Sequence, residues 1–108
     1  MSKRAKTFTK KDIVKQTAKI LDVNIQEIED VVNSVFQSLR EILTLNEREL
    51  RIEIRNFGVF EIKQTKAKPK ARNPRTNEVV YVPPRRKTHF KPGVLIKDAL
   101  KKPVEDLD

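Results

Sequence analysis

Ten basic side chains lie between residues 63 and 91, where the only acid is Glu78. The net charge of this segment, +9, equals the formal charge of the whole chain, so the remaining residues are electrically balanced. Ammonium and guanidinium groups bind phosphate oxygens, and a row of them neutralises a polyanion. The segment therefore predicts a strongly anionic partner. Its basic residues are Lys63, Lys66, Lys68, Lys70, Arg72, Arg75, Arg85, Arg86, Lys87 and Lys91.

Four of these cations recur at every second position: Lys66, Lys68, Lys70 and Arg72. Residues at this spacing share one face of an extended strand, whereas a helix would scatter them. Pro69 also disfavours a helix interior, because proline has no N–H group and blocks the preceding turn. Turn formers follow at residues 72–77, and a Val-Val-Tyr-Val run then resumes the strand pattern. The pattern predicts a two-stranded ribbon, out along residues 62–72 and back along residues 78–87, with Pro74 near its tip.

A solvated or disordered basic linker is the alternative interpretation, because runs of charge are more often solvated than functional. The period of two in the charges and the β-branched return limb favour the ribbon. Its outward limb has almost no large apolar side chain, so it is expected to project into solvent and to lie against a nucleic acid.

The composition of the whole chain narrows the function classes. Its 108 residues allow one domain, and without the ribbon the core is small for a stable monomer, so self-association is expected. The chain has no cysteine, and the single His89 cannot build a metal site. No segment is long and apolar enough to cross a bilayer, and no apolar run follows the basic residues 1–6, so we expect a soluble intracellular protein. The sequence indicates no cofactor and no small-molecule substrate.

Two amphipathic helices are expected before the ribbon. The capping-box spacing of Thr9–Asp12 begins a helix over residues 10–21, and the same spacing at Asn24–Glu27 begins a longer helix that ends near Leu43. The apolar stripe of the longer helix is wider than one short neighbour can cover. This excess predicts that part of the stripe is shared with a second copy of the chain.

Short strands and a final helix are expected to surround the ribbon. Apolar and charged residues alternate over residues 50–55, which is typical of a half-buried strand. Asn56–Gly58 is a turn candidate, because Asn and Gly adopt positive φ readily. Residues 59–62 form a second strand that continues into the ribbon. Phe90–Gly93 is expected to break the chain, and residues 94–102 to form a short helix.

The predicted organisation is one α+β domain. Phe57, Phe60 and Phe90 flank the base of the ribbon, where aromatic residues are more often core, or the core of a dimer, than a platform for bases. The basic residues Lys3, Arg4 and Lys6 are candidates for additional phosphate contacts. The expected parts are a flexible basic extension (1–8), a helical body (9–45), a β-hairpin (48–62), a basic ribbon arm (63–88), a C-terminal helix (93–102) and an acidic tail (103–108).

Short motifs at three places identify a family. They are Asn56–Phe60 at the hairpin turn, Arg72–Thr76 at the ribbon tip, and Phe90–Gly93 followed by Lys97–Ala99. With the order of elements, they resemble the HU/IHF family of bacterial architectural DNA-binding proteins over Thr9 to Lys102. The resemblance implies an intertwined dimer with a helical body, a small antiparallel β-sheet and two long protruding β-ribbon arms. It also implies minor-groove binding and bending of double-stranded DNA by a homodimer in the bacterial cytoplasm, associated with the nucleoid.

The resemblance also implies roles for individual residues. Pro74 would be an apolar wedge that enters a base step, as this class of proteins uses. Ala71 and Asn77 stand where the family usually has glycine, so the tip geometry is expected to differ. The other implied DNA contacts are Arg72, Asn73 and Arg75 at the tip, Lys66, Lys68, Lys70, Arg85, Arg86 and Lys87 along the ribbon, and Arg55, Lys10 and Lys97 at the flanks of the body.

Three other functions remain open from the residues alone. An RNA-binding protein would also use a basic ribbon, although an A-form duplex offers a shallow minor groove that a ribbon cannot clasp in the same way. A nuclease or phosphoesterase fits poorly, because the acids are scattered over predicted helix faces. A dimeric protein-interaction module would carry the basic ribbon incidentally.

Overall fold

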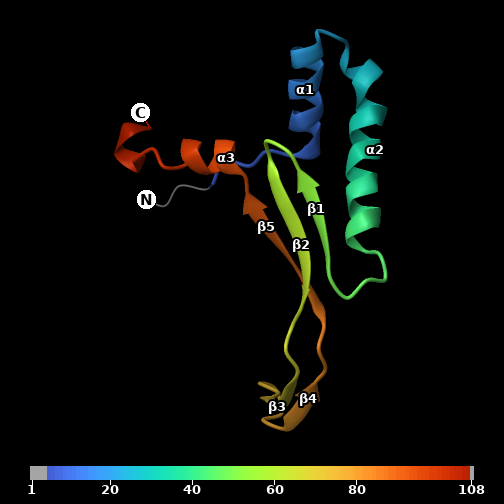
Figure 1. Cartoon of the computed structure of the whole chain (residues 1–108), viewed down its shortest axis with the longest axis vertical. Coiled ribbons are helices and arrows are strands. Elements are labelled where there is room, and N and C mark those ends of the chain that lie inside the picture. Colours follow the sequence, from blue (N-terminus) through green and yellow to red (C-terminus); the bar gives the residue numbers. More distant parts are fainter. Residues whose placement is uncertain (1–4, 108) are drawn as a thin grey trace. The chain divides into compact units, whose positions relative to one another are not determined.

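Helices and antiparallel strands occupy separate stretches of this chain, which confirms the α+β class (Figure 1). The computed structural model describes residues 5–107. Contacts divide the chain into two compact units, Met1–Ile42 and Leu43–Asp108. The elements are α1 (Lys10–Leu21), α2 (Ile25–Leu43), β1 (Leu50–Ile54), β2 (Gly58–Gln64), β3 (Lys68–Arg72), β4 (Val79–Val82), β5 (Arg86–Pro92), α3 (Val94–Ala99) and the 3-10 helix η1 (Val104–Asp106).

Both predicted helices of the first unit are confirmed, with their capping residues. The Thr9 N–H and hydroxyl groups donate to Asp12 Oδ2 at 2.8 and 3.1 Å. These hydrogen bonds hold the pKa of the Asp12 carboxyl group below its ordinary value. Asp22, with φ of 54°, adopts the left-handed conformation that ends α1. At the start of α2, the Asn24 N–H donates to Glu27 Oε2 at 3.3 Å.

The first unit buries little of its apolar surface. Within residues 5–42, the buried apolar side chains are Val14 and Ala18 of α1 and Val32 of α2. Other large apolar side chains on the two helices remain exposed: Ile13, Ile20, Leu21, Val31, Val35, Phe36 and Ile42. An exposed apolar stripe of this kind is typical of a surface that another protein chain covers.

The second unit contains a three-stranded antiparallel sheet in the order β1-β2-β5. The predicted hairpin is confirmed: Leu50 pairs with Ile62, and Ile54 pairs with Gly58. The expected break at Phe90–Gly93 is wrong, because β5 continues through Pro92 and every residue of it pairs with β2. Polar and charged residues fill most of β5 and leave it without the usual apolar signal of a strand, and its pairing partner is distant in the sequence.

The turn between β1 and β2 depends on Asn56 and Gly58 in different ways. Asn56 has φ of 64°, as expected for the turn, whereas none of the glycines has positive φ. Gly58 is needed for space, since a Cβ atom there would lie 2.5 Å from the Lys91 carbonyl oxygen. Beside it the rings of Phe60 and Phe90 pack with centroids 4.8 Å apart, and the ring of Phe57 lies 5.4 Å from that of Phe90. The phenylalanine cluster is therefore a packing element, as predicted.

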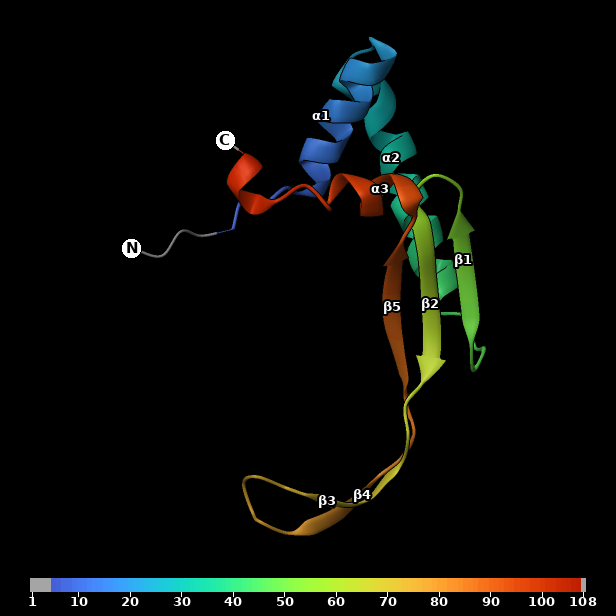
Figure 2. The same cartoon turned by 60° about the vertical axis from the view of Figure 1, so that its left-hand side comes forward.

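The ribbon arm follows from β2 and β5 and consists of β3 and β4 (Figure 2). Its limbs are not continuous strands as expected, because regular pairing stops after Gln64 and resumes at Lys68. Thr65 bridges the gap: its N–H donates to Arg85 O at 2.7 Å, and its hydroxyl oxygen accepts from the Arg85 N–H at 2.8 Å. A register shift between Lys68 and Ala71 inserts an extra residue in β3. The period of two therefore does not run unbroken along the limb, and its four cations do not share one continuous face.

The C-terminal elements are shorter than expected. α3 ends at Ala99, and η1 follows Pro103 within the predicted acidic tail. Lys3 and Arg4 of the predicted extension lie outside the described residues, and the Lys6 ammonium lies 5.6 Å from the centre of the Phe8 ring. None of the helices in residues 5–107 combines the length and the apolar character that a bilayer crossing requires.

Candidate nucleic-acid interface

The basic side chains of the arm are exposed, whereas Asn73 at the tip is half-buried. The predicted residues of the second unit lie in two places, on the arm and at the opposite end of the three-stranded sheet. Arg55 follows β1, Lys97 lies in α3, and both are exposed. Lys10 begins α1 in the first unit and is likewise exposed. The exposed predicted residues on the arm and its base are Lys66, Lys68, Lys70, Arg72, Pro74, Arg75, Arg85, Arg86 and Lys87.

A closed loop forms the tip of the arm between β3 and β4. The Asn73 N–H donates to Glu78 O at 2.8 Å, and the Asn77 N–H donates to Asn73 O at 2.7 Å. The Asn73 side chain stabilises the turn from within, since its Oδ1 atom accepts from the Arg75 N–H at 2.9 Å. These bonds leave the exposed ring of Pro74 at the turn of the loop. A fixed loop of this kind can bring an apolar ring and two guanidinium groups into the same groove.

Arg86, at the base of the arm, binds the protein itself. Its Nη1 atom donates to Leu45 O at 2.6 Å and to Glu47 O at 3.0 Å. The guanidinium group thus holds the loop before β1 against the start of β5, while Arg85 and Lys87 on either side stay exposed. Sequence reasoning assigned Arg86 to phosphate binding and missed these carbonyl groups, which are about forty residues away in the chain.

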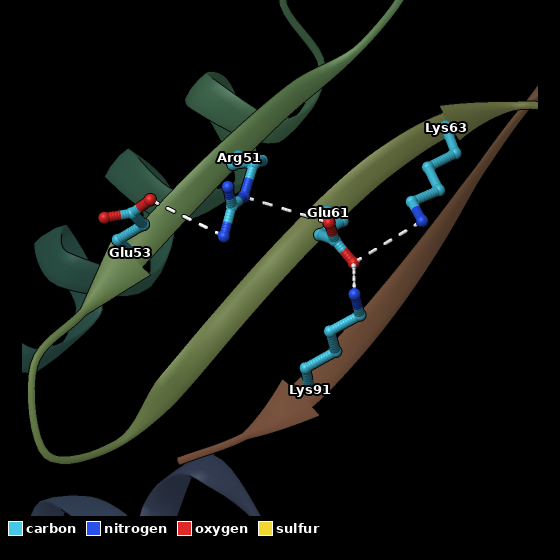
Figure 3. A network of polar contacts seen from close by, with 5 residues as sticks. All are labelled: Arg51, Glu53, Glu61, Lys63 and Lys91. Carbon is cyan, nitrogen blue, oxygen red and sulfur yellow. Dashed lines mark ion pairs between the residues drawn. The ribbon is translucent and has the colours of Figure 1, made fainter.

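A buried carboxylate, that of Glu61, lies among three cations on the sheet (Figure 3). The Glu61 side chain is 8 % exposed; its Oε1 atom lies 3.1 Å from Lys91 Nζ and 3.8 Å from Lys63 Nζ. Its Oε2 atom lies 3.8 Å from Arg51 Nε, and the Arg51 Nη2 atom lies 3.5 Å from Glu53 Oε1.

This network changes the charge balance at the base of the arm. The Lys91 ammonium group lowers the pKa of Glu61 against the opposing effect of burial, and the charges of Lys63 and Arg51 lower it further. Glu61 is therefore ionised at neutral pH and partly neutralises two of the ten cations, Lys63 and Lys91. The sequence analysis did not predict this network around Glu61. The register of the hairpin, which pairs Arg51 with Glu61, could have indicated it.

Groups that could carry metal chemistry are not assembled in the described part of the chain. Within residues 5–107 no set of three or more His, Cys, Asp or Glu side chains could hold a metal ion. His89 lies in β5 opposite Glu61, which the cations already surround. The arrangement favours binding of an anionic polymer by the arm.

Comparisons with known proteins agree with this geometry. The family model described as bacterial DNA-binding protein matches residues 8–101. DNA-binding protein HU of Staphylococcus aureus is 32% identical over 94 residues, which cover 87% of this chain and the whole relative. DNA-binding protein HU of Thermotoga maritima is 28% identical over 94 residues, with the same coverage.

A solved structure resembles this chain in fold and, more distantly, in sequence. The Anabaena HU-DNA cocrystal structure matches with a TM-score of 0.74 and 25% identity, over 89% of this chain and all of that chain. The chain therefore belongs to the bacterial DNA-binding protein family, which confirms the resemblance to HU/IHF proteins and the prediction of a DNA-binding protein rather than an enzyme.

Proposed function

We propose that this chain forms a homodimer that binds the minor groove of duplex DNA with its two arms and bends the duplex. The observation that carries the proposal is the arm itself: exposed cations run along the outward limb toward a closed loop that presents Pro74, and exposed cations also stand at the base of the return limb. The Anabaena HU structure was solved with DNA, and its fold matches this chain over nearly its whole length.

The exposed apolar surface supports the dimer. Val31, Val35 and Phe36 on α2 are between 37% and 53% exposed in the single chain. Burying such side chains stabilises association by roughly 25 cal/mol per Å² of apolar surface removed from water. Because few side chains are fully buried in either unit, we expect the folded state to require the second copy.

Phosphate neutralisation supplies the affinity in this proposal. Lys66, Lys68, Lys70, Arg85 and Lys87 contact phosphates along the arm, and Arg55, Lys10 and Lys97 contact the flanking duplex. Each contact releases condensed counterions, so log K falls with log salt by about 0.9 per phosphate. With on the order of ten of these candidate contacts made at the same time by one dimer, the slope is roughly minus nine.

The tip deforms the duplex. Pro74 enters a base step, where a rigid ring without a donor loses little conformational freedom and leaves no polar group unpaired. Unstacking costs a few kcal/mol per step, and bending costs on the order of 1 to 6 kcal/mol. Arg72 and Arg75 beside the wedge, and the flanking contacts that the bend permits, offset these costs. A protein of this kind works in the bacterial cytoplasm on the nucleoid.

A competition experiment at several salt concentrations tests the proposal. Labelled duplex DNA bound to the full chain is challenged with unlabelled duplex DNA or double-stranded RNA of the same length. We expect DNA to compete far better than RNA, and the slope of log K against log salt to lie near minus nine. Equal competition by RNA, or a slope of only two or three, would refute a dimer that clasps and wraps DNA.

A further inference from the structure

The tip loop carries a carboxamide, that of Asn77, at a position where the backbone needs none. Asn77 has φ of 60°, and its N–H donates to Asn73 O at 2.7 Å. This closure fixes the residue in the left-handed region, which glycine adopts at least as easily as asparagine. The side chain of Asn77 is therefore free to serve another purpose.

Arg72 orients this carboxamide. Its Nη1 atom donates to Asn77 Oδ1 at 3.1 Å and more weakly to Asn77 O at 3.5 Å. A guanidinium group only donates hydrogen bonds, so the amide must turn its oxygen toward Arg72 and its NH2 group away. The pair thus presents two N–H donors in a fixed direction, and a side chain held in place before binding loses less entropy when it binds.

The NH2 group of Asn77 has no acceptor in the protein. Among the described residues no hydrogen bond engages Nδ2, and the side chain is exposed. The other carboxamide of the loop, that of Asn73, is half-buried and uses its oxygen on the Arg75 N–H. Asn77 is therefore the exposed amide donor in the loop that also carries Pro74.

The minor groove offers matching acceptors. An A·T pair in either orientation presents the adenine N3 and thymine O2 acceptors, whereas a G·C pair adds the guanine 2-amino donor. An amide N–H group can donate to the acceptors of an A·T pair, whereas at a G·C pair it meets the guanine 2-amino group, which is also a donor. We propose that Asn77, oriented by Arg72, reads the minor-groove edge beside the Pro74 wedge and favours pairs without a 2-amino group. This inference rests on the proposed minor-groove binding.

Inosine provides the test, because an I·C pair differs from a G·C pair in the minor groove only by lacking the 2-amino group. The full chain, Asn77→Gly and Asn56→Gly are titrated with I·C and G·C duplexes of equal length at one salt concentration. Asn77→Gly removes the carboxamide and accepts the positive φ. Asn56→Gly makes the same substitution at the positive-φ turn between β1 and β2, away from the tip loop. I·C and G·C duplexes also differ in flexibility, but this difference affects all three proteins equally. The informative quantity is therefore how the ratio of the I·C and G·C affinities changes from one protein to the next.

We expect the wild type to prefer I·C over G·C by a ratio about tenfold to a hundredfold larger than that of Asn77→Gly, because each of the two tips loses one hydrogen bond worth about threefold to tenfold. Asn56→Gly should keep the wild-type ratio. An Asn77→Gly ratio equal to that of the wild type would overturn the inference. Bending of the same duplexes shows whether the role of Asn77 or the proposed function has failed. If the wild type bends DNA but has the same I·C to G·C affinity ratio as Asn77→Gly, only the role of Asn77 is overturned. If the wild type binds without bending the duplex, the proposed function is overturned as well.

Discussion

Replacement of Gly58 by alanine should destabilise the sheet that supports the arm. A Cβ atom would lie 2.5 Å from Lys91 O and 2.7 Å from two ring carbons of Phe90, and real Cβ atoms essentially never approach within 3.0 Å. Either β5 moves away from β2, or the Phe90 ring tilts off Phe60. Such overpacking costs about 1 to 3 kcal/mol, while alanine restricts the unfolded chain and restores about 0.4 to 1 kcal/mol. We expect the free energy of unfolding to fall by roughly 1 to 2 kcal/mol.

Urea denaturation followed by circular dichroism measures this loss. The protein concentration must be the same for every variant, because dimerisation couples stability to concentration. Gly93→Ala is the matched control: its Cβ atom would lie 3.1 Å from Phe57 O, so its neighbours need to move by only a few tenths of an ångström. A wild-type midpoint for Gly58→Ala, or a greater loss for Gly93→Ala, would refute the argument that Gly58 is required for space.

Three further substitutions separate binding from stability. Lys66→Gln should make the salt slope about 1.8 shallower, because the proposed dimer loses two phosphate contacts of about 0.9 each; Lys101→Gln, whose ammonium lies 3.3 Å from Asp98 Oδ1, should leave the slope unchanged. Glu61→Gln should be less stable than the wild type at neutral pH. The folded-state pKa of Glu61 is lowered, so its stabilisation is present above the unfolded value near 4.5 and is lost as pH falls through the lowered pKa. Urea midpoints that differ equally at neutral and strongly acidic pH would contradict this. Arg86→Lys should lower the free energy of unfolding by about 1 kcal/mol, since it loses the paired bonds to two carbonyl groups, and should keep the salt slope; a shallower slope at wild-type stability would assign Arg86 to phosphate instead.

Local signals in the sequence were enough to predict α1, α2 and the hairpin. The start of α1 follows from the capping box at Thr9, which acts within a few residues, and the structure adds the left-handed Asp22 at its end. β1 and β2 follow from alternation and from the positive φ of Asn56. These elements are predictable because the groups that decide them are neighbours in the chain.

The features that were not predicted from the sequence depend on contacts between residues far apart in the chain. β5 is a strand because β2 pairs with it, although Phe90 is its only large apolar side chain. Glu61 is surrounded by cations from three strands, and Arg86 binds carbonyl groups far away in the sequence. The composition was enough to predict the candidate site. Which of its cations form ion pairs, which bind carbonyl groups and which remain exposed to a ligand depends on the register of the strands.

The bend at Pro74 is the central claim, and end-to-end energy transfer on a doubly labelled duplex of a few helical turns tests it most directly. Wild type and Pro74→Ala are titrated at several salt concentrations, and binding is followed on the same samples. We predict that the wild type shortens the distance between the duplex ends, and that Pro74→Ala binds with a similar salt slope but shortens it less. A wild type that saturates the duplex without shortening it would contradict the account.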